Sequence, residues 1–239
     1  ANTLKESGRF DEMETSLRRA IIVNPYYVEA HNNLGITLKD LGRLEEAEAG
    51  LRYAISLKPD YAEGHNNLGL TLRDQDRLEE AEVSLMQAIS LKLDFTEAYS
   101  NLGITLEQLG RLNESEICLR QSIILKTDNT KVYNNLSITL RALDRLEEAE
   151  VSLRRSLALN PGYAGAHNNL GLTLKELRRL DEAEMSYREA LVLKPDFSEA
   201  HQNLGDLLMR MGKHEEGLNE SMVGGGIISF DLKNGLSIE

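Results

Sequence analysis

The sequence predicts an all-α protein, an α-solenoid in which copies of one helical hairpin stack side by side. The first observation behind this prediction is an internal repeat. The string Asn32-Asn33-Leu34-Gly35, or a close variant of it, returns every 34 residues without insertion or deletion. The second observation is the helical spacing of leucine and alanine inside each copy. A fixed period of this kind is typical of solenoids, in which each unit buries its apolar side against the next.

Each copy begins with a helix that we expect over about residues 28–41 in the first complete unit. Leu34, Leu38 and Leu41 lie four and three residues apart, which places them on one face of a helix. Gly42 follows directly, and glycine is typical just after a helix end.

A second helix is expected over about residues 43–57. Leu44, Ala47 and Leu51 begin its apolar stripe. Pro59 ends this helix, because the residue before a proline is restricted to extended conformations. Since two helices cannot cover both apolar stripes alone, neighbouring hairpins must stack.

Columns of small residues recur on both helices of the unit. The column on the first helices consists of Gly35, Gly69, Gly103, Ser137, Gly171 and Gly205. Small side chains let paired helices approach closely, and a larger residue fills the space alongside. That larger column consists of Leu51, Leu85, Leu119, Leu153 and Tyr187.

The phase of the repeat divides the chain into three parts. Residues 1–27 match the later part of one unit, and residues 28–223 hold six complete units, the last of them degenerate and capping. Residues 224–239 form a glycine linker and a predicted β-hairpin, because Asn234-Gly235 lies between alternating apolar residues. The chain starts where the middle of a helix is expected, so we interpret it as a piece of a longer array.

Composition excludes several classes of protein. The chain has 39 acidic and 27 basic side chains, for a formal charge of −12, and nucleic-acid binding needs a basic face. A single cysteine cannot form an internal disulfide. No apolar run approaches the roughly 20 residues that span a bilayer, and no signal peptide is recognisable. We therefore expect a cytoplasmic protein that binds neither nucleic acid nor membrane.

The 34-residue period, the order of small and large columns and the exit prolines Pro59, Pro161 and Pro195 resemble the tetratricopeptide repeat. This resemblance implies a right-handed superhelix whose first helices line a concave groove. The sequence departs from the family pattern where tryptophan is usual, at His31, His65, Tyr99, Tyr133, His167 and His201. Leu93 and Thr127 also replace the exit proline in two units.

No arrangement of residues predicts catalysis, a metal site or a cofactor. The histidines in the tryptophan column lie one repeat apart, and helices stacked about 8–10 Å apart cannot bring two imidazoles onto one metal. We interpret them as packing residues. The glycines at 224–226 lack the residues of a phosphate-binding loop. Acidic clusters such as Glu45-Glu46-Glu48 indicate a solvated outer face, and Cys118 has no histidine partner in its unit. We therefore predict that this chain is not an enzyme.

One column of asparagines is unexpected, because asparagine is a poor helix former and this column lies in mid-helix in every complete unit. We name it the asparagine ladder: Asn33, Asn67, Asn101, Asn135, Asn169 and Asn203. One interpretation is that each side chain bonds the backbone of a neighbouring helix and fixes the stacking. The other is a row of carboxamides that bond the backbone of an extended peptide. The resemblance implies the second, since a matching ladder in the O-linked N-acetylglucosamine transferases binds peptide backbone. Both interpretations can hold together.

Two further sets join the candidate peptide-binding site. The flanking asparagines, which precede the ladder, are Asn32, Asn66, Asn134 and Asn168. The aliphatic row, three positions beyond the ladder, is Ile36, Leu70, Ile104, Ile138 and Leu172, and we expect it to be partly exposed. Mixed charges follow at the groove edge, at Lys39, Asp40, Arg73, Asp74, Arg141, Lys175 and Glu176.

These observations predict a protein–protein interaction scaffold that takes an extended peptide or partner protein in its groove. The alternative is the substrate-recognition arm of a larger enzyme, for example a glycosyltransferase, with its catalytic domain outside this chain. A clamp for acidic chaperone tails is not expected, because the positions that precede the ladder carry asparagine or serine in place of lysine and arginine. Self-association through the C-terminal hairpin or the uncapped first helix is a third hypothesis.

Overall fold

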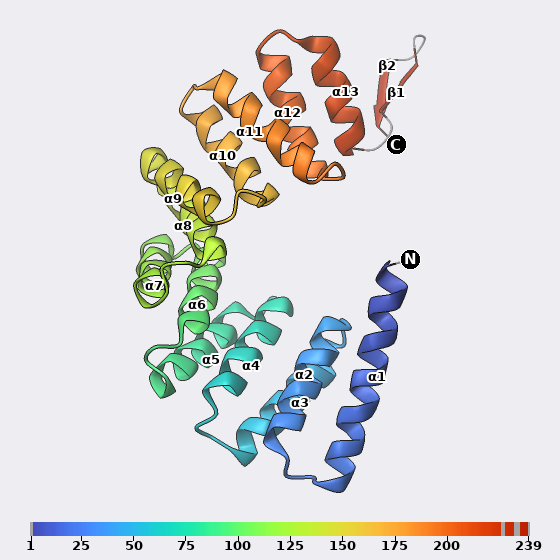
Figure 1. Ribbon diagram of the computed structural model, residues 1–239, viewed down its shortest axis with the longest axis vertical. Coiled ribbons are helices and arrows are strands. Elements are labelled where there is room, and N and C mark those ends of the chain that lie inside the picture. Colours follow the sequence, from blue (N-terminus) through green and yellow to red (C-terminus); the bar gives the residue numbers. More distant parts are fainter. Residues whose placement is uncertain (1, 226–227, 232–234, 239) are drawn as a thin grey trace. The chain divides into compact units, whose positions relative to one another are not determined.

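The computed structural model describes residues 2–225, 228–231 and 235–238, with side chains from residue 9 to residue 225. These parts of the chain contain thirteen α-helices and two short β-strands (Figure 1). The helices are α1 (Asn2–Val23), α2 (Val28–Asp40), α3 (Leu44–Leu57), α4 (Ala62–Asp74), α5 (Leu78–Leu91), α6 (Thr96–Gln108), α7 (Leu112–Leu125), α8 (Thr130–Ala142), α9 (Leu146–Leu159), α10 (Ala164–Glu176), α11 (Leu180–Leu193), α12 (Ser198–Arg210) and α13 (His214–Gly225). The predicted all-α solenoid class is confirmed.

The chain divides into two compact units, residues 1–126 and residues 127–239. In the first unit α2 pairs with α3, α4 with α5 and α6 with α7, and α1 packs on α2. In the second unit α8 pairs with α9, α10 with α11 and α12 with α13. The first helices of successive repeats also touch within each unit: α2 on α4, α4 on α6, α8 on α10 and α10 on α12. We call the surface that these first helices form in each unit the inner face.

A left-handed residue follows each first helix and turns the chain into the second helix. Gly42 has a φ of 75°, as expected for the residue that ends α2. The equivalent residues are Gly42, Asp76, Gly110, Asp144, Arg178 and Gly212, with φ between 59° and 80°. A side chain at positive φ is sterically unfavourable, so the packing of the two helices holds Asp76, Asp144 and Arg178 in this conformation.

The two helices of a repeat approach closely at the small column. A Cβ atom added to Gly35 would lie 2.6 Å from Cγ of Leu51, and Gly69 has the same relation to Leu85. Both leucines are fully buried. The small and large columns therefore interlock as the sequence predicts.

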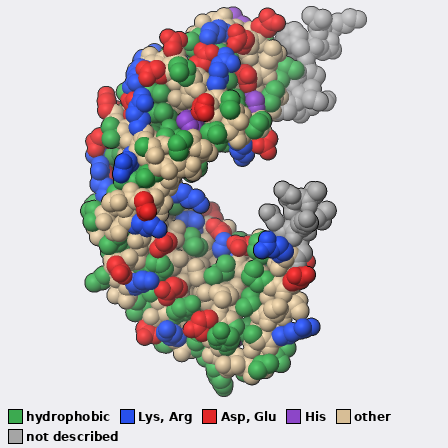
Figure 2. Space-filling view, viewed as in Figure 1, with side chains coloured by type: hydrophobic (Ala, Val, Ile, Leu, Met, Phe, Trp, Pro, Cys, Tyr) green, Lys and Arg blue, Asp and Glu red, His purple; other side chains and the backbone are tan. Residues whose placement is uncertain are grey.

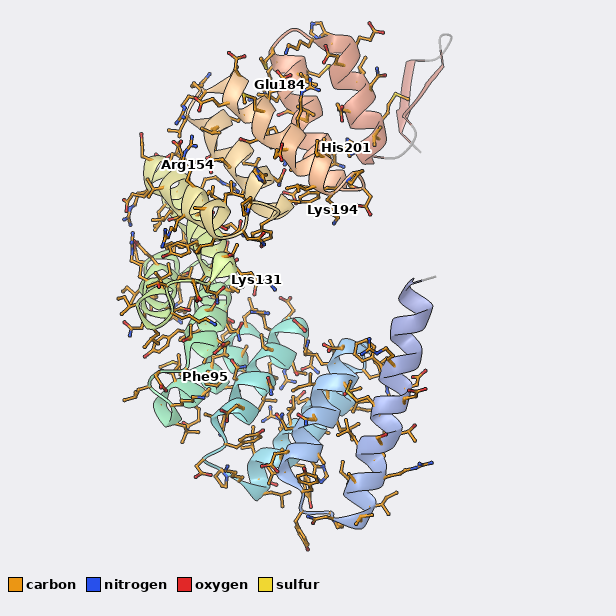
Figure 3. All side chains as sticks on the ribbon, viewed as in Figure 1. Phe95, Lys131, Arg154, Glu184, Lys194 and His201 are labelled. Carbon is orange, nitrogen blue, oxygen red and sulfur yellow. The ribbon has the colours of Figure 1, made fainter. Side chains whose placement is uncertain are left out.

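Ion pairs join successive second helices, where the acidic clusters were expected to be solvated. Glu48 accepts hydrogen bonds from Arg52 on its own helix and from Arg77 in the next repeat, with 2.6 Å between Arg77 Nη1 and Glu48 Oε2. The same inter-repeat pair recurs as Glu14–Arg43, Glu82–Arg111, Glu150–Arg179 and Glu184–Lys213. The Glu48 side chain is only 16% exposed, so the expectation of a solvated face is wrong for this column. Figure 2 shows the basic and acidic side chains interspersed on the surface, and Figure 3 labels Glu184.

The C-terminal helix runs further than the sequence predicts. α13 continues through two residues of the glycine linker and ends at Gly225. The reason is close packing, because a Cβ on Gly224 would lie 2.7 Å from the carbonyl oxygen of Ser198 on α12. The outer surface of α13 also exposes the apolar side chains Leu218, Met222 and Val223, so it is less polar than expected for a capping helix.

Two short strands follow α13. β1 (Ile228–Asp231) and β2 (Gly235–Ile238) pair antiparallel, with Phe230 opposite Leu236. They lie where the sequence predicts a hairpin. The turn residue Asn234 lies outside the described residues.

Tyr187 replaces leucine in the large column, and its hydroxyl generates a stability prediction. The side chain is fully buried, and its Oη has no hydrogen-bond partner among the described residues. An unsatisfied buried hydroxyl costs about 1–3 kcal/mol. We expect Tyr187→Phe to raise the free energy of unfolding by about 1 kcal/mol in urea titrations, while Tyr53→Phe at an exposed site changes it little. A destabilised Tyr187→Phe variant would show that the hydroxyl is bonded.

The inter-repeat ion pairs predict a loss of stability in acid. Burial alone would raise the pKa of Glu48 and Glu150, but hydrogen bonds from two arginines each outweigh it and hold both pKa values below the ordinary value of 4.5. A carboxylate with a lowered folded-state pKa stabilises the fold above its unfolded pKa, and this contribution disappears as the pH falls through the folded value. In urea titrations measured from pH 7 to pH 3, the midpoint concentration of urea should therefore decrease once the pH is below about 4.5.

A matched variant tests the assignment to these two carboxylates. Glu48→Gln with Glu150→Gln should start less stable at pH 7 and lose less on acidification. The same acid-induced loss in both proteins would contradict it.

Candidate functional site

The asparagine ladder lies on the inner face, and its side chains bond across adjacent repeats. In the first unit Nδ2 of Asn67 donates to Oδ1 of Asn32, and Nδ2 of Asn101 donates to Oδ1 of Asn66, each over 2.9 Å. In the second unit the same bond joins Asn169 to Asn134 over 2.9 Å and Asn203 to Asn168 over 3.0 Å. The acceptor is thus a flanking asparagine of the preceding repeat, where the sequence analysis expected backbone.

Burial separates the two asparagine sets. The flanking asparagines are buried, with exposed fractions of 2–7%. In the ladder, Asn33 is exposed and the other five are half-buried. The structure therefore places the flanking asparagines beneath the surface as acceptors for the ladder, and leaves the ladder itself partly exposed.

Bonds within a repeat extend these contacts into a chain. Nδ2 of Asn32 donates to Oδ1 of Asn33 over 3.2 Å, and Nδ2 of Asn66 donates to Oδ1 of Asn67 over 3.5 Å. With the inter-repeat bonds, five carboxamides from Asn101 to Asn33 form one series with a single direction. Such a series polarises its members and fixes the orientation of each amide.

Each ladder side chain keeps bonding capacity after these contacts. A carboxamide offers two N–H donors and two acceptor lone pairs. Asn67 uses one donor toward Asn32 and one lone pair toward Asn66. One donor and one lone pair remain, which is what one residue of an extended backbone needs, since it carries one N–H and one carbonyl.

A column of threonines, which the sequence analysis missed, lies four residues beyond the ladder. Each hydroxyl is buried and donates to the carbonyl of a ladder residue, at Thr37, Thr71, Thr105, Thr139 and Thr173. Hydrogen bonds of this kind compete with the backbone hydrogen bonds of the helix and bend it. The recurrence of threonine every 34 residues in five successive repeats was the signal that could have revealed the column.

The aliphatic row borders the ladder as predicted. All five of its members are half-buried. In the last repeat Asp206 takes this position, is exposed and pairs with Lys175 over 3.3 Å. The row therefore offers apolar surface beside the ladder in five repeats.

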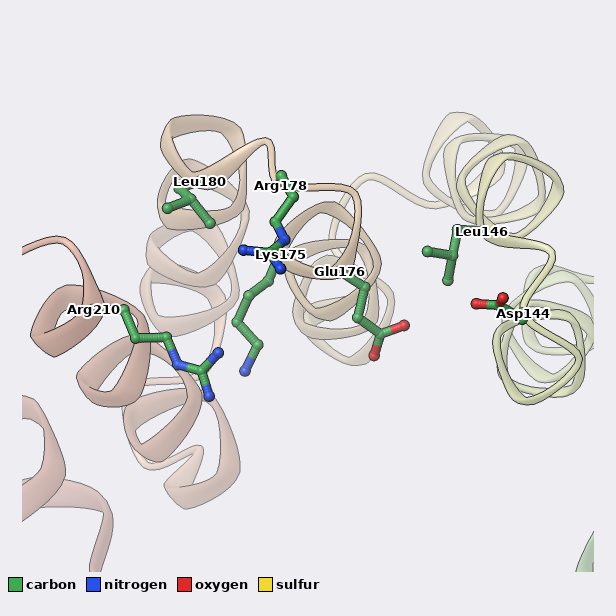
Figure 4. A pocket seen from close by; sticks show the side chains of 7 residues that line it. All are labelled: Asp144, Leu146, Lys175, Glu176, Arg178, Leu180 and Arg210. Atoms are coloured by element: carbon green, nitrogen blue, oxygen red, sulfur yellow. The ribbon is translucent and has the colours of Figure 1, made fainter.

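A pocket of about 660 Å3 opens at the charged edge of the inner face in the second unit (Figure 4). It is lined by Asp144, Leu146, Lys175, Glu176, Arg178, Leu180 and Arg210. Lys175 and Arg210 point into it from α10 and α12, and both pair with Asp206 over 3.3 Å. Lys175 and Arg210 are therefore already matched by an acid.

The histidines in the tryptophan column have a role that packing alone does not describe. Nε2 of each donates to the carbonyl oxygen of the exit proline six residues earlier, over 2.8–3.1 Å: His31 to Pro25, His65 to Pro59, His167 to Pro161 and His201 to Pro195. The two repeats that lack the proline have Leu93 and Thr127 in its place, and they carry Tyr99 and Tyr133 instead of histidine. Histidine and proline therefore change together along the chain. Nδ1 of His201 also lies 2.6 Å from Oε2 of Glu220 (Figure 3).

Other chemistries find no support among residues 9–225. No group of three or more histidine, cysteine, aspartate or glutamate side chains in that range is arranged to hold a metal ion. Burial raises the pKa of the Cys118 thiol to about 11, which leaves it protonated and unreactive near neutral pH. Of the helices in the described ranges, none has the length and apolar character needed to cross a bilayer.

These features define a helical-repeat scaffold with a polar ladder on its inner face. Three sequence profiles of the tetratricopeptide repeat match the chain, at residues 16–49 and 152–185, at residues 35–92 and 170–221, and at residues 96–127 and 131–160. The chain belongs to the tetratricopeptide repeat family, and this membership supports a general role as a protein–protein interaction scaffold.

Solved structures share the fold at low sequence identity. The chain matches a protein of the APC/C hetero-tetramer Cut9–Hcn1 with a TM-score of 0.79 and 18% identity, over 95% of this chain and 46% of that one. It matches PilF of Pseudomonas aeruginosa with a TM-score of 0.72 and 18% identity, over 81% and 88% of the two chains. It matches YrrB, described as a TPR protein with an unusual peptide-binding site, with a TM-score of 0.60 and 21% identity, over 77% and 95%. The chain thus spans less than half of the Cut9–Hcn1 chain that it matches. No curated protein sequence matches it.

The bond between ladder and flanking asparagines predicts a local effect of removing an acceptor. Asn66→Ala removes the Oδ1 atom that Asn101 bonds. We expect the side-chain amide protons of Asn101 to exchange faster with solvent in NMR spectra, and the free energy of unfolding to fall by about 1 kcal/mol. Asn160→Ala, which removes an exposed bond to Gly162, is the control. Unchanged exchange at Asn101 in Asn66→Ala would show that the bond does not order the ladder.

Proposed function

We propose that the inner face binds an extended peptide segment of a partner protein, with the asparagine ladder on the peptide backbone. The observation that carries this proposal is the orientation of the ladder. Asn67, Asn101, Asn169 and Asn203 are half-exposed, and each is held by a bond to the repeat before it. A side chain that is ordered before binding loses less conformational entropy on contact with a ligand.

The spacing of the repeats suits an extended chain. Adjacent packed helices lie about 8–10 Å apart, and an extended peptide advances about 3.3 Å per residue. A peptide that crosses the first helices therefore meets a new ladder residue every two to three positions. The side chains of the peptide between these positions reach the aliphatic row and make apolar contacts with it. The ladder bonds only the backbone of the peptide.

Two comparisons support the proposal. YrrB, which shares the fold, is described as having a peptide-binding site. The ladder also resembles that of the O-linked N-acetylglucosamine transferase arrays, which binds peptide backbone. A recognition arm of a larger enzyme would use the same face, and the sequence of the full-length gene tests that alternative.

Selection from a library of random linear 12-residue peptides displayed on phage tests the proposal. We expect the wild-type chain to enrich peptides, and the triple variant Asn101→Ala, Asn135→Ala and Asn169→Ala to bind them at least tenfold more weakly in fluorescence anisotropy. Each alanine removes one donor and one acceptor, and a net hydrogen bond contributes about 0.5–1.5 kcal/mol.

A matched control separates binding from stability. Ser122→Ala with Ser156→Ala removes two hydrogen bonds that second-helix serines on α7 and α9 donate to the carbonyls of Thr96 and Thr130. This variant should keep peptide affinity, and circular dichroism should show similar helicity in both variants. Peptide binding that survives the triple variant would contradict the proposal, and unfolding of the triple variant alone would assign the ladder to stacking.

A further inference from the structure

We propose that Arg73, on α4, binds the side-chain carboxylate of an aspartate or glutamate in a peptide held on the inner face of the first unit. This inference rests on the proposed function and adds to it a chemical preference at one position. The starting observation is a half-buried arginine whose guanidinium keeps an unpaired donor. Nη1 of Arg73 is buried and has no hydrogen-bond partner, and the described residues provide no ion pair to the guanidinium.

The sequence of the neighbouring repeat explains why Arg73 has no acidic partner. The position of Arg73 is basic in three other repeats, at Lys39, Arg141 and Lys175, and glutamate in the next one, at Glu107. Each of the three basic residues pairs with an acid one repeat further on. Nζ of Lys39 lies 3.8 Å from Oδ2 of Asp74, and Nε of Arg141 lies 3.6 Å from Oε1 of Glu176. The residue that should pair with Arg73 by the same relation is Gln108, which carries no charge.

Asp74, the acid that follows Arg73 in the chain, does not supply the missing ion pair. Burial lowers the pKa of Arg73, Asp74 raises it by less, and the net effect is a lowered pKa. An arginine remains charged near neutral pH even so. Asp74 is itself engaged by Lys39 of the preceding repeat. A partly buried guanidinium is therefore left with unused donors on the inner face.

The position of Arg73 relative to the ladder favours a side chain of the peptide over its terminus. Arg73 lies three residues beyond Leu70 and six beyond Asn67, about 9 Å along the helix axis. The ladder continues to Asn33 on one side and to Asn101 on the other, so a peptide backbone on the ladder passes α4 without ending there. A glutamate or aspartate that reaches across Leu70 can meet the guanidinium.

The chemistry of the guanidinium selects a carboxylate. Its planar donors match two carboxylate oxygens, and such charge-assisted bonds are stronger than neutral ones. The net charge of −12 opposes an acidic peptide only weakly at this range, since physiological salt screens exposed charges beyond about 8 Å. Lys175 and Arg210 at the 660 Å3 pocket are poorer candidates, because they already share Asp206.

The same phage library, selected on the wild-type chain and on three variants, tests the proposal. Arg73→Gln removes the cation. Arg141→Gln removes the same charge at the equivalent position of another repeat, where the arginine pairs with Glu176, and is the matched control. Gln108→Glu supplies the missing acid inside the protein, so that Arg73 gains an intramolecular partner.

We expect wild type and Arg141→Gln to enrich peptides with aspartate or glutamate at one register position. Arg73→Gln and Gln108→Glu should select peptides without that preference. A selected acidic peptide should bind Arg73→Gln about tenfold or more weakly in fluorescence anisotropy, and its Asp→Asn or Glu→Gln version should bind both proteins alike. Gln108→Glu should also raise the thermal midpoint, a gain that Arg73→Gln in the same chain should cancel.

The outcomes separate the two proposals. Enriched peptides without an acidic preference, or a preference that persists in Arg73→Gln, would overturn the role of Arg73 and leave peptide binding standing. A preference that persists in Gln108→Glu while the thermal midpoint rises would also overturn it. Failure of the wild-type chain to enrich any peptide would overturn both.

Discussion

The contact between a glycine backbone on the first helix and a leucine on the second is the constraint on which the other features depend. With Cγ of Leu51 only 2.6 Å from where a Cβ of Gly35 would be, the second helix lies directly against the first. Each hairpin is then narrow enough for the first helices of adjacent repeats to touch. Asparagine is a short side chain, and its carboxamide reaches a neighbouring repeat only at such a spacing. The polar ladder thus depends on an apolar contact on the other side of the same helix.

The fold could be predicted from the sequence because its signals lie within one repeat. Apolar spacing located α2 and α3 to within one residue of their observed bounds, and Gly42 marked the turn between them. α13 was placed less well, because a close contact with α12 holds Gly224 in the helix and nothing local signals such a contact. The candidate site was predicted in part. The ladder was visible because asparagine disfavours helices, yet its acceptor was not, since backbone and flanking asparagine both lie on the neighbouring helix.

Charges in this protein act mainly between neighbouring repeats. The pattern of its own helix alone predicts that Glu48 is a surface residue. Its partner Arg77 lies 29 residues later in the chain, so the pair is not evident from one helix. Pairs of this type fix the register of one second helix against the next, because a shift of one residue would separate them. Most of the strong electrostatic contacts therefore lie on the second helices, and the inner face keeps a more neutral, hydrogen-bonding surface. A large net charge and a weakly charged binding surface are compatible for this reason.

The bond between histidine and the exit proline has a consequence for how such arrays can be cut and rejoined. His65 belongs to one hairpin and Pro59 to the connection that leaves the hairpin before it. A cassette that starts at the first helix would carry the histidine and leave its proline behind. Joining such a cassette to a unit that ends like Leu93 or Thr127 would place the ring against a connection with a different backbone preference. The junctions of an exchangeable module are therefore better placed within a second helix. The proline and the histidine that donates to its carbonyl then stay in the same module.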